Sequence, residues 1–235
     1  MMIRAAMDVF WRSLKDAWEE LIPLALVNLV WFASWGLPLA LIPSSRSSIL
    51  TLALVLLGLL GGAVCTSGLY HVSDRVAHGK TARFEDWREG VRLFWKQGLL
   101  WLLGNVLVLA LVVWNIAFYG QNITAAWGVF LQGIWLALAL FWLTMQIYFW
   151  PMLLRLEKPS VFTAWRFSAM LIVASPFFTF FITTFTLLVL IISLATGVVL
   201  GVLGGTATAV LGSNAVLTLL YTLGKIENPR PPVGE

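Results

Sequence analysis

Between Lys96 and Arg155 the chain reads QGLLWLLGNVLVLALVVWNIAFYGQNITAAWGVFLQGIWLALALFWLTMQIYFWPMLL, without one Asp, Glu, Lys or Arg. A helix needs about 20 apolar residues to cross the hydrocarbon core of a bilayer, so this stretch has the length for two crossings. The polar turn Gly120-Gln121-Asn122 divides it. Such a turn belongs outside the hydrocarbon core, because lipid offers its peptide groups no partners. The stretch therefore predicts an antiparallel pair of membrane-spanning helices.

Three more charge-free stretches have the same character. They cover residues 21–45, 47–73 and 167–224, and the last again has the length for two crossings. The whole chain is 60% hydrophobic and 11% charged, whereas soluble domains are about 45–50% apolar and about 25% charged. We therefore expect an all-α polytopic membrane protein. Its six transmembrane helices are predicted at Leu21–Leu41, Ile49–Tyr70, Leu99–Tyr119, Ala125–Trp150, Phe177–Thr196 and Thr206–Leu223.

Basic residues mark one side of these six helices. Every Lys and Arg except Arg46 lies before the first helix, between the second and third, between the fourth and fifth, or after the sixth. Because Lys and Arg concentrate in cytoplasmic loops, both termini are predicted to be cytoplasmic. The net charge of +4 is spread over these loops, so nucleic-acid binding is not expected.

A dipeptide recurs along the chain with a period of about 77 residues. Its three copies are Trp11-Arg12, Trp87-Arg88 and Trp165-Arg166. We predict three parallel repeats, each a cytoplasmic amphipathic helix followed by an out-and-back hairpin. They cover residues 1–75, 76–155 and 156–228, and 229–235 form a flexible tail. The six Trp and Arg side chains are predicted interfacial anchors, because both groups favour the headgroup region.

The predicted amphipathic helices precede the first, third and fifth spans. In the first, apolar residues recur at helical spacing: Ile3, Met7, Phe10, Trp11, Leu14 and Trp18. The second covers residues 84–95. The third covers 160–176 and begins at Ser160, which has the side chain of an N-cap residue. Helices of this kind lie in the membrane interface, with their aromatic side chains in the acyl boundary.

The predicted spans carry polar but no charged side chains. They include the amides Asn28, Asn105, Asn115, Gln132, Gln146 and Asn214, together with Thr144 and Ser193. They either form hydrogen bonds between helices or surround a polar cavity that binds a small solute. Since proton relays and ion paths use intramembrane ionisable residues, their absence disfavours ion-coupled transport. It disfavours intramembrane enzyme chemistry as well.

Three potential metal ligands lie at the predicted cytoplasmic end of the second span. His71, Asp74 and His78 have spacing that lets them share a helix face, and their nitrogen and oxygen atoms are ligands for divalent ions. Two histidines in a loop are a weak metal signal, so we expect ordinary solvated polar residues there, and no cofactor. Cys65 is the single cysteine, so the chain has no intramolecular disulfide.

Short aromatic motifs resemble the YesL family of bacterial integral membrane proteins, a group without an established biochemical activity. In the first half they are Asn28-Leu29-Val30-Trp31, Leu37-Pro38, Tyr70, Phe84 and Phe94-Trp95-Lys96-Gln97-Gly98. In the second half they are Tyr148, Pro151 and Pro176. The resemblance implies a bacterial inner membrane and an accessory role beside a sugar transporter, and it supplies no catalytic residues.

These observations favour a non-enzymatic integral membrane accessory or scaffold protein associated with carbohydrate uptake. Its expected partners are the lipid bilayer and another membrane protein complex, such as a sugar transporter. The alternative is a passive facilitator or channel for a small neutral or hydrophobic molecule, because hydroxyl and amide side chains are enough to line a passive path.

Overall fold

A computed structural model of the chain describes residues 2–123, 126–197 and 200–227. The regular elements in these ranges are helices. They are α1 (Met2–Glu19), α2 (Leu21–Ala40), the 3-10 turn η1 (Ile42–Ser44), α3 (Ser48–Ala77), α4 (Phe84–Asn122), α5 (Ala126–Leu153), α6 (Val161–Ala174), α7 (Pro176–Thr196), the π-helical turn η2 (Leu200–Gly204) and α8 (Gly205–Thr222).

Within the described ranges, six helical segments have the length and apolar composition to cross a membrane. They are Leu21–Ser44, Ser48–Ala77, Phe84–Asn122, Trp127–Leu153, Pro176–Thr196 and Gly201–Thr222. Each contains or closely overlaps one predicted span. The prediction of an all-α fold with six helices long and apolar enough to span a membrane is therefore confirmed.

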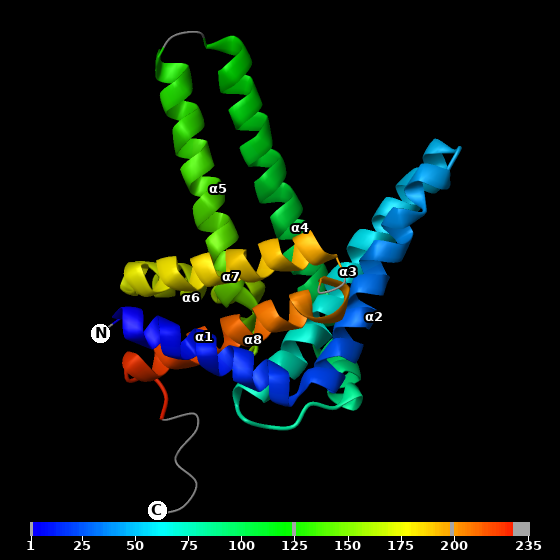
Figure 1. The fold of residues 1–235 in the computed structure, drawn as a ribbon. Helices are drawn as coiled ribbons and strands as arrows, with labels where there is room; N and C mark the ends of the chain where they lie inside the picture. The colour runs from blue at the N-terminus through cyan, green and yellow to red at the C-terminus, as the bar shows by residue number, and fades with distance from the viewer. Residues whose placement is uncertain (1, 124–125, 198–199, 228–235) are drawn as a thin grey trace, which may run out of the picture.

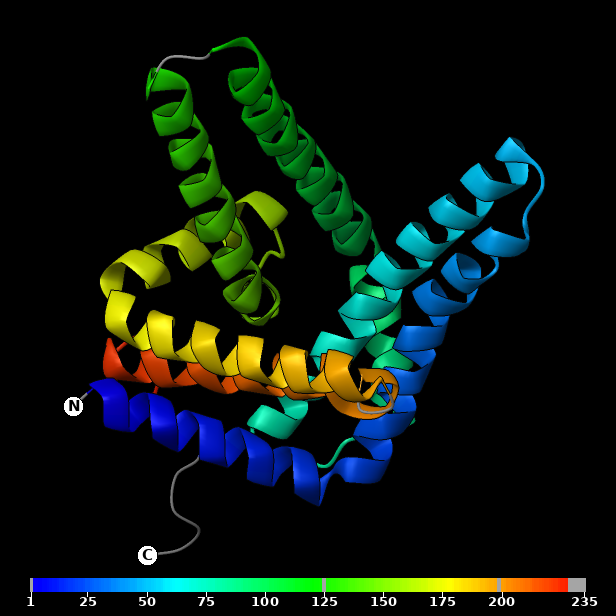
Figure 2. The same cartoon turned by 45° about the horizontal axis from the view of Figure 1, so that its top comes forward.

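Two long hairpins project from a common base. α2 pairs with α3 and α4 pairs with α5, and the two hairpins diverge from each other toward their tips (Figure 1). Across the base lies a layer of three helices, in which α8 runs between α1 and α7 and antiparallel to both (Figure 2). The hairpin tips are therefore far from the end of the molecule where α1 begins and α8 ends (Figure 1).

The helix α8 forms the centre of the base. It packs against α1, α2, α3, α5 and α7, and 72% of the residues in its most apolar stretch are buried. Small residues permit this, because they let neighbouring backbones come close. At Gly212, for example, an added Cβ would lie 2.6 Å from the carbonyl oxygen of Ile147 on α5.

The predicted boundary between the second amphipathic helix and the third span is wrong. Residues 84–95 and the span that follows them are one continuous helix, α4. Nothing breaks the helix at Gly98, since glycine lowers helix stability by only about 1 kcal/mol. Gly98 instead permits close contact with α3: an added Cβ would lie 2.7 Å from the carbonyl oxygen of Ala63.

The predicted arrangement as three equivalent parallel hairpins is not confirmed. The α7–α8 pair lies across the base instead of projecting beside the other hairpins (Figure 1), because α8 packs against α1, α3 and α5. The connection also differs: α7 ends at Gly197, whose φ of 60° suits glycine, and η2 precedes α8. The repeat boundaries stay a prediction, and the predicted tail at 229–235 lies outside the described residues.

Candidate functional site

Asn28 on α2 forms hydrogen bonds with the turn η2 and with the start of α8. Its Nδ2 donates to the carbonyl oxygen of Gly201 at 2.7 Å, and its Oδ1 accepts from the backbone N–H of Thr206 at 3.0 Å. Asn28 and Thr206 are both fully buried. The π-helical turn η2 interrupts the regular helical hydrogen bonding, and one amide side chain bonds a backbone group within η2 and another just after it, in α8.

A second buried amide joins α8 to α1. Asn214 donates from Nδ2 to the carboxylate of Asp16 at 2.9 Å and to the hydroxyl of Ser13 at 3.1 Å. All three side chains are buried. α1 therefore faces α8 with a narrow polar strip, while its large apolar residues Trp11 and Trp18 stay exposed.

A third network joins α4 to α5 and combines indole with amide groups. Gln146 Oε1 accepts from Trp101 Nε1 at 2.8 Å, and Asn105 Oδ1 accepts from Trp142 Nε1 at 3.0 Å. The Asn105 amide lies 3.4 Å from Gln146 Oε1. The sequence predicted these amides as candidates for interhelical hydrogen bonds, and the structure brings the two together.

The remaining intramembrane amides have simpler roles. Asn115 donates to the carbonyl oxygen of Leu111 in its own helix at 2.8 Å. Gln132 on α5 donates to the carbonyl oxygen of Ile116 on α4 at 3.2 Å, near the hairpin tip. Neither residue joins the networks at the base.

An ion pair holds the end of α5 to α3. Arg155 and Asp74 approach to 2.7 Å, and only 14% and 18% of their side chains are exposed. Arg155 also donates to the carbonyl oxygen of Pro151. Burial lowers the pKa of the Arg155 guanidinium, while the charge of Asp74 and its hydrogen bond oppose that shift. The guanidinium nevertheless stays charged, so the pair is a permanent electrostatic contact.

The three candidate metal ligands His71, Asp74 and His78 do not form one cluster. His78 Nδ1 lies 3.4 Å from the Asp74 carboxylate, but Asp74 is already paired with Arg155. His71 instead packs on α4, where its ring centroid lies 6.1 Å from that of Phe94. Among the residues that the structure describes, no group of three potential metal ligands is found.

The three Trp-Arg pairs have different surroundings. Trp11 is 62% exposed on α1. Trp87 packs against Gly68 of α3. Trp165 lies between Trp142 and Phe149, at centroid distances of 5.0 and 5.3 Å. Arg12, Arg88 and Arg166 are all exposed. The shared interfacial depth of these six residues stays a prediction.

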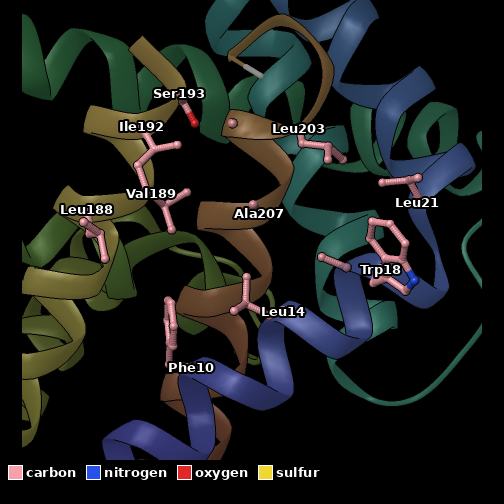
Figure 3. A pocket seen from close by; sticks show the side chains of 12 residues that line it. Phe10, Leu14, Trp18, Leu21, Leu188, Val189, Ile192, Ser193, Leu203 and Ala207 are labelled. Carbon is pink, nitrogen blue, oxygen red and sulfur yellow. The ribbon is translucent and has the colours of Figure 1, made fainter. Parts of the chain in front are cut away.

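An apolar groove opens between α1 and α7, with a volume of about 340 Å³. Phe10, Leu14 and Trp18 of α1 line one side of it, and residues of α7, η2, the start of α8 and the first residue of α2 line the rest (Figure 3). Ser193 is the polar residue of the groove, and its hydroxyl is buried without a hydrogen-bond partner in the described part of the chain. The groove has the apolar lining that suits a lipid chain.

A second cavity, of about 380 Å³, lies between α5 and α7 and reaches α3 and α8. Unlike the groove, it has a polar set of lining residues: Tyr70, Thr144, Gln146, Thr183, Thr186 and Thr208. The sequence-based candidates for a polar cavity included Gln146 and Thr144 but not Tyr70, Thr183, Thr186 or Thr208. The one feature of the sequence that indicated a polar face here was the spacing of Thr183 and Thr186, which places both on one side of a helix.

The arrangement can hold helices together and can receive neutral molecules from the membrane. Both cavities are lined without an ionisable acid or base apart from the phenol of Tyr70. Comparison of the chain with models of protein families, with curated proteins and with solved structures gives no match.

Proposed function

We propose that this protein is a non-enzymatic scaffold of the membrane, whose two projecting hairpins bind a partner membrane protein. The supporting observation is the uneven burial of the spanning helices. Only 6% of the residues in the most apolar stretch of α4 are buried within the chain, and 17% in each of α2, α3 and α5, against 72% in α8. The base is thus a packed unit, whereas the hairpins leave most of their apolar surface for contacts outside the chain.

An exposed apolar helix face can contact either lipid or another protein. The shape of the molecule is therefore needed to choose between the two. The two hairpins diverge (Figure 1) and are joined to a base held by buried hydrogen bonds and an ion pair. Rigid, separated helical hairpins offer long surfaces for helix–helix packing, which in membranes depends on shape and close contact. This geometry favours a partner with helices of its own.

The partner and the location follow from sequence-based expectations. The resemblance to the YesL family implies a carbohydrate-uptake transporter as the partner, and a bacterial inner membrane as the location. The distribution of Lys and Arg supports cytoplasmic termini. The exposed apolar residues of α1, including Ile3, Trp11 and Trp18, support contact of this helix with lipid beside α7 and α8 (Figure 2). The charge-free spans support a role without catalysis.

Photo-cross-linking in intact membranes tests the scaffold. We would place benzoylphenylalanine at Leu107 on α4 and, as the matched control, at Ile191 on α7, since these side chains are 60% and 61% exposed. We expect a protein adduct of one defined mass at Leu107 and none at Ile191, with a membrane transporter identified in the adduct. Lipid adducts alone at Leu107, or the same protein adducts at both positions, would contradict the proposal.

The orientation has its own test, because Cys65 is the single thiol. In a Cys65→Ser chain, Ser45→Cys and Gln121→Cys lie at the two hairpin tips and should react with an impermeant thiol reagent in whole cells. Lys80→Cys and Lys158→Cys lie in connections at the other end of the hairpins and should react only after lysis. Labelling of Lys80→Cys in whole cells would overturn the orientation.

A further inference from the structure

The cavity between α5 and α7 has an apolar mouth and a polar interior. Leu140, Leu143 and Leu187 line it and are 58%, 51% and 52% exposed. In the spanning segments of this protein, such exposed leucines face lipid. Thr186 is buried and Tyr70 and Gln146 are half-buried, so the polar groups lie deeper. A molecule entering from the bilayer therefore meets aliphatic side chains first and hydrogen-bonding groups next.

The deeper groups include donors that the protein does not use. The hydroxyl of Thr183 is buried and has no hydrogen-bond partner in the described part of the chain. The ring of Tyr70 is held by stacking on Trp150, at a centroid distance of 5.9 Å. Gln146 Nε2 donates one hydrogen to the carbonyl oxygen of Trp142 at 3.0 Å, and an amide nitrogen carries two. Hydrogen-bonding capacity that is left unused on burial is costly.

The other hydroxyls of the cavity are left as acceptors. Thr144, Thr186 and Thr208 each donate to a backbone carbonyl oxygen of the preceding turn, at 2.8, 2.9 and 2.8 Å. Their oxygen lone pairs remain for a ligand. An occupant that matches this interior needs both donors and acceptors in a small space, which is the property of a hydroxyl group.

We propose that this cavity binds a neutral lipid with free hydroxyl groups, of the monoacylglycerol or diacylglycerol class. Its glycerol hydroxyls pair with Tyr70, Thr183 and the neighbouring threonines, while its acyl chain leaves past the leucines into the bilayer. No carboxylate, ammonium or guanidinium group lines the cavity, so a charged headgroup would be desolvated without an opposite charge. The volume of about 380 Å³ lies in the range of about 300–1,000 Å³ that is usual for small-molecule sites.

This site is independent of the proposed scaffold, because its polar groups lie between α5 and α7, whereas the scaffold contact is tested on α4. The test uses the full-length protein in nanodiscs and 1-monooleoylglycerol as the probe, with bound lipid counted by native mass spectrometry. We expect Tyr70→Phe and Thr183→Val each to weaken binding by about threefold to tenfold, the factor that corresponds to one net hydrogen bond. Thr184→Val is the matched control on the same helix, because Thr184 is exposed and bonds the carbonyl oxygen of Phe180.

Two further measurements distinguish a site that recognises the hydroxyl groups of the lipid from one that binds only its acyl chain. Methyl oleate has the same chain without the free hydroxyls, so it should bind at least threefold more weakly than monooleoylglycerol. A diazirine-bearing monoacylglycerol should label peptides from residues 140–147 and 183–190. Equal retention of the two lipids, equal binding by Thr183→Val and Thr184→Val, or labelling confined to other helices would overturn the proposal. The cross-linking at Leu107 is unaffected by either result.

Discussion

Replacing Asn28 with leucine should lower the free energy of unfolding by about 2–6 kcal/mol, because it removes the hydrogen-bond partner of one buried and one partly buried backbone group, at about 1–3 kcal/mol each. These groups are the carbonyl oxygen of Gly201 and the N–H of Thr206. Leucine has the same number and branching of side-chain heavy atoms as asparagine and is apolar, so the substitution leaves no cavity and removes the hydrogen bonds. Titration of the purified protein with a denaturing detergent measures it.

The matched control is Asn115→Leu, since Asn115 bonds only its own helix, through the carbonyl oxygen of Leu111. We expect a change within about 0.5 kcal/mol, as for substitutions away from a buried network. Hydrogen exchange adds a local measurement: the amide of Thr206 should exchange much faster in Asn28→Leu and as before in Asn115→Leu. Equal stability of the two variants would show that η2 does not depend on Asn28.

The six spanning helices could be predicted because their signal is local. Charge-free runs such as residues 97–154 exclude a soluble fold, and the length of a bilayer crossing divides them. The ends of the helices could be predicted less well from the sequence. α4 continues from the interfacial residues into the membrane without a break, since amphipathic and apolar patterns are both compatible with one helix.

The central position of α8 could not be predicted from hydropathy. Its span has the lowest mean hydropathy of the six, 1.4, and yet it is the most buried. Inside a membrane protein, apolarity measures contact with lipid, whereas burial against other helices favours small residues such as Gly212 and Ser213. The least apolar span is therefore a candidate for the centre, a rule that runs opposite to that for soluble proteins.

The polar networks illustrate a similar limit. The sequence identified Asn28 and Asn214 as interhelical candidates, but their partners lie more than 170 residues away along the chain, where no local pattern connects them. Asp16 was not among the sequence-based candidates, although it is buried against Asn214. Helical spacing gives the face on which a residue lies, but not which neighbouring helix covers that face.

The second large effect is expected at the ion pair between α3 and α5. Arg155→Met should lower the free energy of unfolding by about 3 kcal/mol, because removing one partner leaves the other charge buried and uncompensated. The pair is short, at 2.7 Å, and only 14% of the Arg155 side chain is exposed. Methionine keeps most of the length of the side chain, so the measured loss comes mainly from the charge.

The matched control is the neighbouring pair Arg75–Asp86, whose shortest separation is 3.2 Å and whose arginine is 35% exposed. Arg75→Met should cost about 1 kcal/mol or less, because Asp86 still accepts the backbone N–H of Arg83 at 2.9 Å. Adding Asp74→Asn to Arg155→Met removes the uncompensated carboxylate, and this should restore at least half of the lost stability. If the double variant is no more stable than Arg155→Met alone, the guanidinium acts mainly by capping the end of its own helix at the carbonyl oxygen of Pro151 and not through its charge on Asp74.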